Sequence, residues 1–127
     1  MKEVVRTEAA PAPFQGAPYS QAIKAGGLVF VAGQVSLKPG DSAISGATIQ
    51  EQTEQVLQNV GAILEAAGSG LDRLVKTTVF LQSLDDFSGM NEVYSKHVGD
   101  RPPARSTFEV AKLPSGALVE IEAIALA

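Results

Sequence analysis

The sequence predicts an α+β fold in which two helices pack on one face of a mixed sheet. Three observations lead to this prediction. Short segments rich in apolar and β-branched residues, typical of strands, occur at both ends of the chain and once in the middle. Two segments carry apolar residues at helical spacing between start and stop signals. The order along the chain is ββ-α-β-α-ββ, and 127 residues are enough for a single domain, 1–127, with a modest core.

The N-terminal region is predicted to form strands around an irregular connector. Residues 2–7 indicate a short first strand. Residues 9–18 contain Pro11, Pro13, Gly16 and Pro18, so this connector cannot be helical. After it, residues 20–25 and 28–35 predict a hairpin that turns at Gly26-Gly27.

The first helix has clear start and stop signals. Thr48 followed by Glu51 fits a capping box, in which each side chain bonds the backbone of the other residue. Gly68 is placed to end the helix. One stripe at helical spacing is predicted to face the core: Ile49, Thr53, Val56, Val60, Ile63, Leu64 and Ala67.

A strand and a second helix follow. Residues 73–82 are apolar and β-branched, which predicts a strand. Ser83 and Asp86 can cap a helix that closes at Gly99. The predicted inward face of this helix contains Phe87, Met90, Val93, Tyr94 and His97.

The C-terminal stretch predicts two strands joined by a short turn. In the first strand Arg105, Thr107 and Glu109 share one face, and in the second Glu120 and Glu122 share one face. An arginine fork and a carboxylate on neighbouring strands could bind a small carboxylate substrate and handle a water or proton beside it. The same side chains could instead form a plain cross-strand ion pair, worth about 0.2–1 kcal/mol if exposed.

The sheet face away from the helices is predicted to be apolar as well. In the last strand this face carries Leu118, Ile124 and Leu126, and residues 28–35 are apolar on both faces. Two helices can cover only one side of a sheet. We therefore expect other subunits to cover the second side, which makes the protein an oligomer.

Composition excludes several kinds of site. The chain has no cysteine, so disulfides, thiolate nucleophiles and cysteine-ligated metals are excluded, and any histidine-based site would depend on His97 alone. A net charge of −4 and a pI near 4.9 argue against nucleic-acid backbone binding. No apolar run approaches the roughly 20 residues that span a bilayer, and the N-terminus lacks a secretory signal. We expect a cytoplasmic protein with no membrane partner.

Six motifs, taken together and in order, resemble those of one family. They are Ala17–Ala22, Val29–Gln34, Val75–Phe80, Asp86-Phe87 with Asn91 and Tyr94, Pro103–Arg105 and Leu118–Ile124. The chain resembles the Rid (YjgF-type) family over nearly its whole length, and within it the RidA group of enamine/imine deaminases. The resemblance implies a chorismate-mutase-like fold and a homotrimer around a central sheet barrel, with sites between subunits.

The resemblance also implies a reaction. RidA-type proteins hydrolyse reactive 2-enamine and 2-imine acids, such as 2-aminoacrylate, 2-iminopropanoate and 2-iminobutanoate, to 2-keto acids and ammonia. These substrates are released by pyridoxal-phosphate enzymes, including dehydratases, and the deaminase itself uses no cofactor or metal. By resemblance, Arg105 holds the substrate carboxylate, Glu120 positions or activates water, and Tyr19 lines the cleft. A planar guanidinium suits a carboxylate better than the point charge of lysine.

Four further residues are expected to contact the substrate. The resemblance places Gly33 and Thr107 where backbone groups approach the ligand, and Phe87 as an aromatic wall. Ala32 stands where many RidA proteins have a serine, which affects rate and substrate range, and Thr107 replaces a frequent cysteine. Without the resemblance, Gly33 indicates a strand bulge and Phe87 a core residue.

Two other functions stay open at this point. The same cleft could sense small 2-keto acids without turnover, because fold does not fix function. Ribonuclease or translation-inhibitor activity is ascribed to some relatives, although the acidic pI and the absence of a basic stripe argue against it. Within the enzyme class, the substrate could also be a pathway-specific aminoacrylate or aminomuconate derivative.

Overall fold

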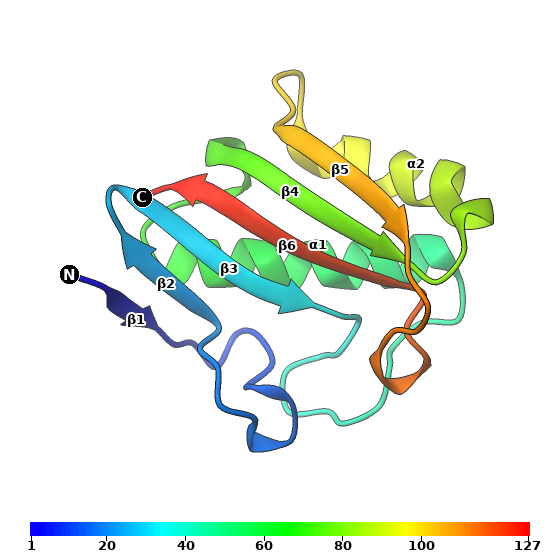
Figure 1. Cartoon of the computed structure of the whole chain (residues 1–127), viewed down its shortest axis with the longest axis horizontal. Coiled ribbons are helices and arrows are strands. Elements are labelled where there is room, and N and C mark those ends of the chain that lie inside the picture. Colours follow the sequence, from blue (N-terminus) through cyan, green and yellow to red (C-terminus); the bar gives the residue numbers. More distant parts are fainter.

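The computed structural model describes all residues, 1–127, and confirms the predicted α+β class (Figure 1). The strands are β1 (Glu3–Val5), β2 (Ala22–Ala25), β3 (Leu28–Gln34), β4 (Leu74–Leu81), β5 (Ala104–Glu109) and β6 (Val119–Leu126), and the helices are α1 (Ile49–Ala66) and α2 (Phe87–Val98). The strands form one mixed sheet in the order β1-β2-β3-β6-β4-β5. Figure 1 shows both helices behind this sheet, so its front face is open. Neither helix is long and apolar enough to cross a membrane.

The N-terminal half follows the predicted course. β2 and β3 form an antiparallel hairpin, and both residues of its Gly26-Gly27 turn have positive φ angles, which glycine adopts without strain. β1 pairs antiparallel with β2. The connector contains no α-helix, as predicted, but it includes one short 3₁₀ turn at Phe14–Gly16.

Helix α1 has a capping box at its start, a glycine just after its end, and one apolar stripe that faces the sheet. Thr48 Oγ1 accepts the Glu51 N–H at 3.1 Å and Glu51 Oε1 accepts the Thr48 N–H at 3.1 Å, which confirms the capping box. Gly68, at φ +82°, lies just beyond the helix end. Every residue of the predicted stripe is buried. Burial of each large apolar side chain contributes about 1.5–3 kcal/mol, so the stripe fixes α1 against the sheet.

The core between helices and sheet divides into two buried clusters. One joins α1 to β3 and the end of β6, through side chains that include Val29, Val31 and Ile63. The other joins both helices to β4 and the start of β6, and its members include Val79, Met90, Tyr94 and Ile121. The alternate residues of β6, among them Glu120 and Glu122, therefore lie on the open face.

The start of α2 differs from the prediction. Ser83 accepts the Asp85 N–H at 3.1 Å and caps a 3₁₀ turn, Leu84–Asp86, that leads into the helix. Asp86 makes no side-chain capping bond, so its predicted capping role is wrong. The preceding 3₁₀ turn already supplies a helical entry, which leaves Ser83 as the residue that caps this junction.

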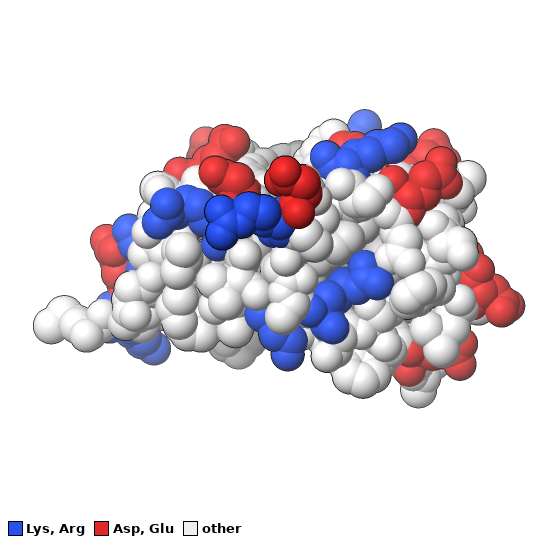
Figure 2. Space-filling view, turned by 90° about the horizontal axis from the view of Figure 1, so that it is seen from above, with Lys and Arg blue, Asp and Glu red and all other residues white.

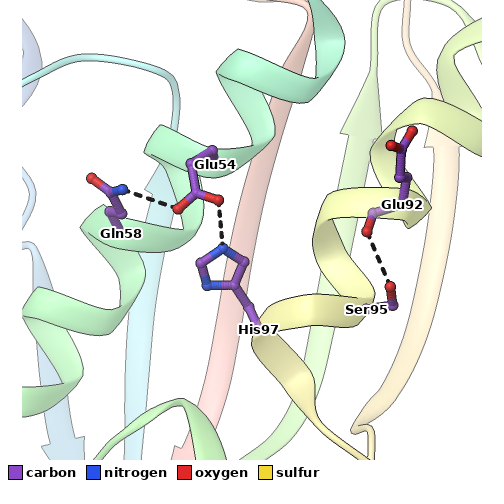
Figure 3. A network of polar contacts seen from close by, with 5 residues as sticks. All are labelled: Glu54, Gln58, Glu92, Ser95 and His97. Carbon is purple, nitrogen blue, oxygen red and sulfur yellow. Dashed lines mark hydrogen bonds and ion pairs between the residues drawn. The ribbon is translucent and has the colours of Figure 1, made fainter.

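The inward face of α2 is confirmed for some predicted residues and wrong for others. Met90, Val93 and Tyr94 are buried, but Phe87 at the first turn is 40% exposed. His97 lies between the two helices, where its Nε2 is 2.9 Å from Glu54 Oε1 (Figure 3). Figure 3 also shows the bond from Gln58 to the other oxygen of Glu54. The position that sequence assigned to the core is therefore a polar link between α2 and α1.

The two C-terminal strands are not neighbours, which corrects the predicted pair. β5 pairs in parallel with β4, and β4 pairs antiparallel with β6, so β4 lies between them. The physical reason is the unit β4-α2-β5, because a helical crossover returns the chain parallel to the strand it left. The segment between β5 and β6 is no tight hairpin turn, and contains a 3₁₀ turn at Pro114–Gly116.

Candidate functional site

One candidate pocket lies at the end of β3, on the open side of the sheet. It has a volume of about 400 Å³ and is walled by the proline-rich connector, the end of β3 with the residues after it, and the loop before β6. The lining includes Tyr19, Ala32, Gly33, Pro114 and Glu120, and we call it the Glu120 pocket. Its walls are mainly apolar, with the Glu120 carboxylate as the one charged group in the lining.

The carboxyl group of Glu120 has no partner within the chain. It forms neither a hydrogen bond nor an ion pair, while β6 holds it partly buried on the open face. Burial, and then the like charge of Glu122, raise the pKa of Glu120 above its ordinary value. Glu120 therefore keeps its proton to a higher pH than a solvated glutamate, as suits a group that accepts and returns a proton.

Gly33 makes room for this carboxylate. The register between β3 and β6 shifts between Val31 and Gln34, so a bulge occurs at the position for which sequence indicated one. A Cβ atom at Gly33 would collide with Oε2 of Glu120. Glycine here lets the carboxylate of Glu120 lie directly against the backbone of β3, and any larger residue would displace that carboxylate.

Tyr19 lines the Glu120 pocket, and no bond within the chain uses its hydroxyl proton. Tyr19 Oη accepts the backbone N–H of Phe14 at 2.7 Å, which ties the connector to the tyrosine. The bond uses an oxygen lone pair and leaves the phenolic O–H free to donate. The side chain is 44% exposed, so this donor is accessible to a ligand.

A second pocket lies on the helix side, between α2 and β5. It has a volume of about 350 Å³, and its lining includes Asn91, Tyr94, Pro103 and Arg105; we call it the Arg105 pocket. The Arg105 guanidinium carbon lies 4.8 Å from the ring centroid of Tyr94 and 5.5 Å from that of Phe87. Its side chain forms no ion pair or hydrogen bond within the chain, so its N–H donors are free for an anion.

Thr107 follows Arg105 on the same face of β5. Its Oγ1 atom is buried and has no hydrogen-bond partner. A buried hydroxyl without a partner is energetically unfavourable. After Arg105, Thr107 is thus the second residue on this face of β5 with a polar group that has no partner within the chain. Asn91, one helical turn before Tyr94, also lines the Arg105 pocket but was not assigned a role from sequence. Its spacing of three residues from Tyr94 was the available signal.

The predicted site residues thus fall into two groups that one chain does not bring together. Tyr19, Ala32, Gly33 and Glu120 line the Glu120 pocket, whereas Arg105, Thr107 and Phe87 belong to the helix side at β5. Strand β4 separates Arg105 from Glu120, and the two side chains point to opposite faces of the sheet. The alternative interpretation, a cross-strand ion pair between them, is therefore wrong.

The open sheet face between these groups carries exposed aromatic and aliphatic side chains. Phe30 is 41%, Leu126 46% and Phe108 52% exposed. Beside them, Ile124 and Glu122 line a shallow pocket on this face. No group of three His, Cys, Asp or Glu side chains that could hold a metal ion comes together in the chain.

Comparisons with known proteins identify close relatives over the full length. The family described as Endoribonuclease L-PSP matches residues 7–127. A RutC family protein of Pyrococcus horikoshii is 52% identical over 98% of both chains. The chloroplastic Reactive Intermediate Deaminase A of Arabidopsis thaliana is 50% identical over 98% of this chain and 65% of its own. A 2-iminobutanoate/2-iminopropanoate deaminase of Mus musculus is 40% identical over 99% of this chain and 92% of its own.

Two solved structures of similar sequence share the fold of this chain. A candidate endoribonuclease of Thermotoga maritima superposes with a TM-score of 0.93 at 48% identity, covering 100% of this chain and 98% of its own. TdcF of E. coli with bound serine superposes with a TM-score of 0.89 at 38% identity, covering 98% of each chain.

Proposed function

We propose that this chain, which belongs to the Rid (YjgF-type) family, is a hydrolytic deaminase of small 2-imino acids. The proposed substrates are 2-iminopropanoate and 2-iminobutanoate with their enamine tautomers, and the products are 2-keto acids and ammonia. One relative named as a 2-iminobutanoate/2-iminopropanoate deaminase and another named as a reactive intermediate deaminase support this substrate class. The observation in this chain that carries the proposal is the pair of unpartnered groups of opposite character, Arg105 and Glu120.

These groups match the chemistry of a protonated 2-imino acid. The substrate carries a carboxylate, which suits the free guanidinium of Arg105. It also carries an electrophilic carbon that must meet water beside a group that exchanges protons. Glu120, with its raised pKa, suits that task.

The complete site requires two copies of the chain. Within one copy, Arg105 and Glu120 lie on opposite sheet faces, so no single small ligand contacts both. The open face carries Phe30, Phe108 and Leu126, whose exposure favours coverage by other subunits. In a closed ring of copies, such as the proposed homotrimer, the β5 edge of one subunit meets the Glu120 pocket of its neighbour.

The proposed reaction proceeds through a carbinolamine. Arg105 binds the carboxylate and fixes C2 near the Glu120 pocket, and the free hydroxyl of Tyr19 donates to the bound substrate. Water held by ionised Glu120 attacks C2 of the iminium, and the water proton passes to the Glu120 carboxylate. Glu120 then protonates the carbinolamine nitrogen and the C2–N bond breaks to release ammonia. As the carbonyl forms, the oxygen passes its proton to this ammonia, which leaves as ammonium while Glu120 is ionised again. The net products are a 2-keto acid and ammonium.

The direct test is release of ammonia and keto acid from imine made in situ. A pyridoxal-phosphate serine/threonine dehydratase supplies the imine, which is the proposed cellular source as well, and semicarbazide traps what remains. The wild-type protein should accelerate release over spontaneous hydrolysis, and Arg105→Ala should not. Equal release with and without wild-type protein on both short imines would refute the proposal. Because Ala32 lines the pocket with a small apolar side chain, bulkier imines form a second substrate series.

A binding module without turnover is the second candidate. TdcF of E. coli is a 38% identical protein with bound serine, a small 2-substituted carboxylic acid. If the present chain only binds such acids, 2-ketobutyrate will bind to it with a measurable Kd while imine hydrolysis remains at the spontaneous rate. Calorimetry and the ammonia assay on the same sample separate the two candidates.

The description of the family as an endoribonuclease names a third activity. In this chain the only histidine, His97, bonds Glu54 between the helices and lines neither pocket. Figure 2 shows basic and acidic groups interspersed on the face seen from above, without one continuous basic stripe. The net charge of −4 adds to this, because RNA binding depends on clustered cations. We therefore expect no salt-sensitive RNA binding from nuclease-free protein.

A further inference from the structure

The Arg105 guanidinium rests on aromatic rings and not on an acid. The ring centroids of Tyr94 and Phe87 lie 4.8 Å and 5.5 Å from its central carbon, and no acidic side chain bonds it. The face of an aromatic ring attracts a cation and occupies none of its N–H donors. A carboxylate in the same place would hold the arginine but would also compete with a substrate carboxylate.

Tyr94 is itself held at both ends. Its backbone belongs to α2, and its hydroxyl oxygen lies 2.6 Å from Thr77 Oγ1 on β4. Tyr94 is 5% and Thr77 1% exposed, so this hydrogen bond is buried. Thr77 is also the register partner of Arg105 on the neighbouring parallel strand. The tyrosine ring thus extends from α2 across to β4 beside the strand position that carries the arginine.

We infer that Tyr94, tethered by Thr77, is the positioning residue that holds Arg105 for the substrate carboxylate. This inference rests on the proposed function of Arg105 and assigns the residue that orients it. An arginine at a sheet edge has many rotamers, and ordering it costs free energy at each binding event. A fixed ring that already confines the guanidinium lowers this cost. Phe87, which is more distant and 40% exposed, is a weaker second wall.

A purely structural role for Tyr94 makes a different prediction. Tyr94 also belongs to a buried cluster with Met90 and Val98, so its replacement will lower stability in either case. If packing were its only role, its effect on ligand affinity would not depend on which residue occupies position 105. The coupling between positions 94 and 105 therefore distinguishes the two roles.

The test is a double-mutant cycle on the Kd of 2-ketobutyrate, measured by calorimetry on the oligomeric protein. Tyr94→Leu should raise the Kd by about fivefold to tenfold with Arg105 present, and by less than about twofold in an Arg105→Lys background. Tyr94→Phe and Thr77→Val, which keep the ring but remove the tether, should each raise it by about twofold to threefold. In turnover of 2-iminobutanoate, Tyr94→Leu should raise KM while kcat stays within about twofold.

An equal change in Kd in both backgrounds, or none in either, would overturn the inference. If Tyr94→Leu does not fold, the cycle is repeated with Phe87→Leu, which changes the weaker and more exposed aromatic wall. In that case the inference would be overturned if neither Phe87→Leu nor Thr77→Val changed the Kd. The proposed function is judged separately by wild-type turnover. Coupling without turnover would support the role of Tyr94 and leave the chain as a binding module.

Discussion

The Arg105 pocket and the Glu120 pocket hold their charged groups in opposite ways. On the helix side, aromatic faces support a permanent cation and leave its donors unused. On the open side, burial and the neighbouring Glu122 disfavour the charge on a carboxylate and raise its pKa. One pocket stabilises a charge without neutralising it, and the other makes the charge of a carboxylate less favourable than it is in water.

This difference indicates what each pocket is adapted to receive. Buried or half-buried charged groups in proteins are normally paired, and here two remain unpaired while lying on opposite faces of one sheet. Neither can neutralise the other within a copy. A ligand that presents a carboxylate to Arg105 and a hydrolysable carbon to Glu120 satisfies both, provided that two copies bring the pockets together.

Loss of the cation should have the largest effect. Arg105→Ala should lower kcat/KM by about 10²–10³-fold, because a desolvated carboxylate would lose its charged partner. The measurement is the semicarbazide-trapping assay with 2-iminobutanoate. Arg101→Ala, which removes an exposed arginine near the start of β5, is the matched control and should leave activity unchanged. Wild-type activity in Arg105→Ala would show that the Arg105 pocket takes no part in the reaction.

Loss of the proton-exchanging group should come next. Glu120→Gln should lower kcat by about 10²-fold, the lower end of general acid–base contributions. The matched control is Glu122→Gln, which removes a like charge that raises the pKa of Glu120. In this control activity should persist, and the acidic limb of its pH profile should move to lower pH because Glu120 then ionises more readily. A limb that stays in place would contradict the assignment of this limb to Glu120.

Glu120→Gln should stabilise the fold at neutral pH although it lowers activity. A carboxyl group whose pKa is raised by folding contributes stability below its unfolded pKa, and this contribution is lost as pH rises through the folded pKa. At pH 7 Glu120→Gln should therefore raise Tm, by about 2 °C for a chain of this size, and the gain should disappear in acid. A lower Tm at pH 7 would contradict the pKa direction.

Disturbing the close contact between the Gly33 backbone and the Glu120 carboxylate should have a smaller effect on activity. Gly33→Ala places a Cβ against Oε2 of Glu120 and should displace that carboxylate, with a loss of about tenfold in kcat. In a Glu120→Ala background, which removes the carboxylate, the added Cβ meets no Oε2 atom, so Gly33→Ala should cost little further activity. Comparable losses in both backgrounds would indicate that the bulge tolerates no change, whatever its relation to Glu120.

The smallest effect is expected outside both pockets. Glu54→Gln weakens the link to His97, the first cause of the lowered pKa of Glu54. A carboxylate whose pKa is lowered by folding stabilises the fold at pH values above its unfolded pKa. Glu54→Gln should therefore lower the free energy of unfolding by about 0.5 kcal/mol at pH 7, and this difference should vanish as pH falls through the folded pKa. Urea unfolding measures it, with Glu65→Gln, an exposed α1 glutamate, as control. A change in deaminase activity would contradict its separation from the site.

Local signals predicted most of the fold. The Thr48–Glu51 capping box, the Gly26-Gly27 turn and the stripe of α1 all rest on neighbours within a few residues, and all are confirmed. Strand partners depend on contacts that are distant in sequence, and here the prediction for the C-terminal strands was wrong. The chain order placed β5 beside β6, whereas the helical crossover through α2 places β5 beside β4.

The candidate site was predictable as a set of residues but not as an arrangement. Period-two alternation placed Arg105 with Thr107 and Glu120 with Glu122 on shared faces of their strands. It could not indicate that the two faces are opposite sides of one sheet, because that depends on strand order and register. Nor could it identify Tyr94 as the ring beneath Arg105, since helical periodicity marks a core position whatever lies across from it.

The central claim, that one site uses Arg105 of one copy and Glu120 of another, is tested most directly by mixing two inactive variants. Arg105→Ala and Glu120→Gln chains are unfolded together, refolded as mixed oligomers, and assayed with 2-iminobutanoate. If sites form between neighbouring copies, random assembly should restore about a quarter of them with both groups intact. As a control for exchange, the two chains carry different affinity tags, and co-purification of both tags shows that mixed oligomers have formed. In a complementary mixture, wild type with an equal amount of the doubly substituted chain should lose about half its starting activity by the same statistics.

We predict recovery to about a quarter of the activity of the same amount of wild-type chain. Activity that stays at the sum of the two separate variants, although the differently tagged chains co-purify as mixed oligomers, would contradict a site shared between copies.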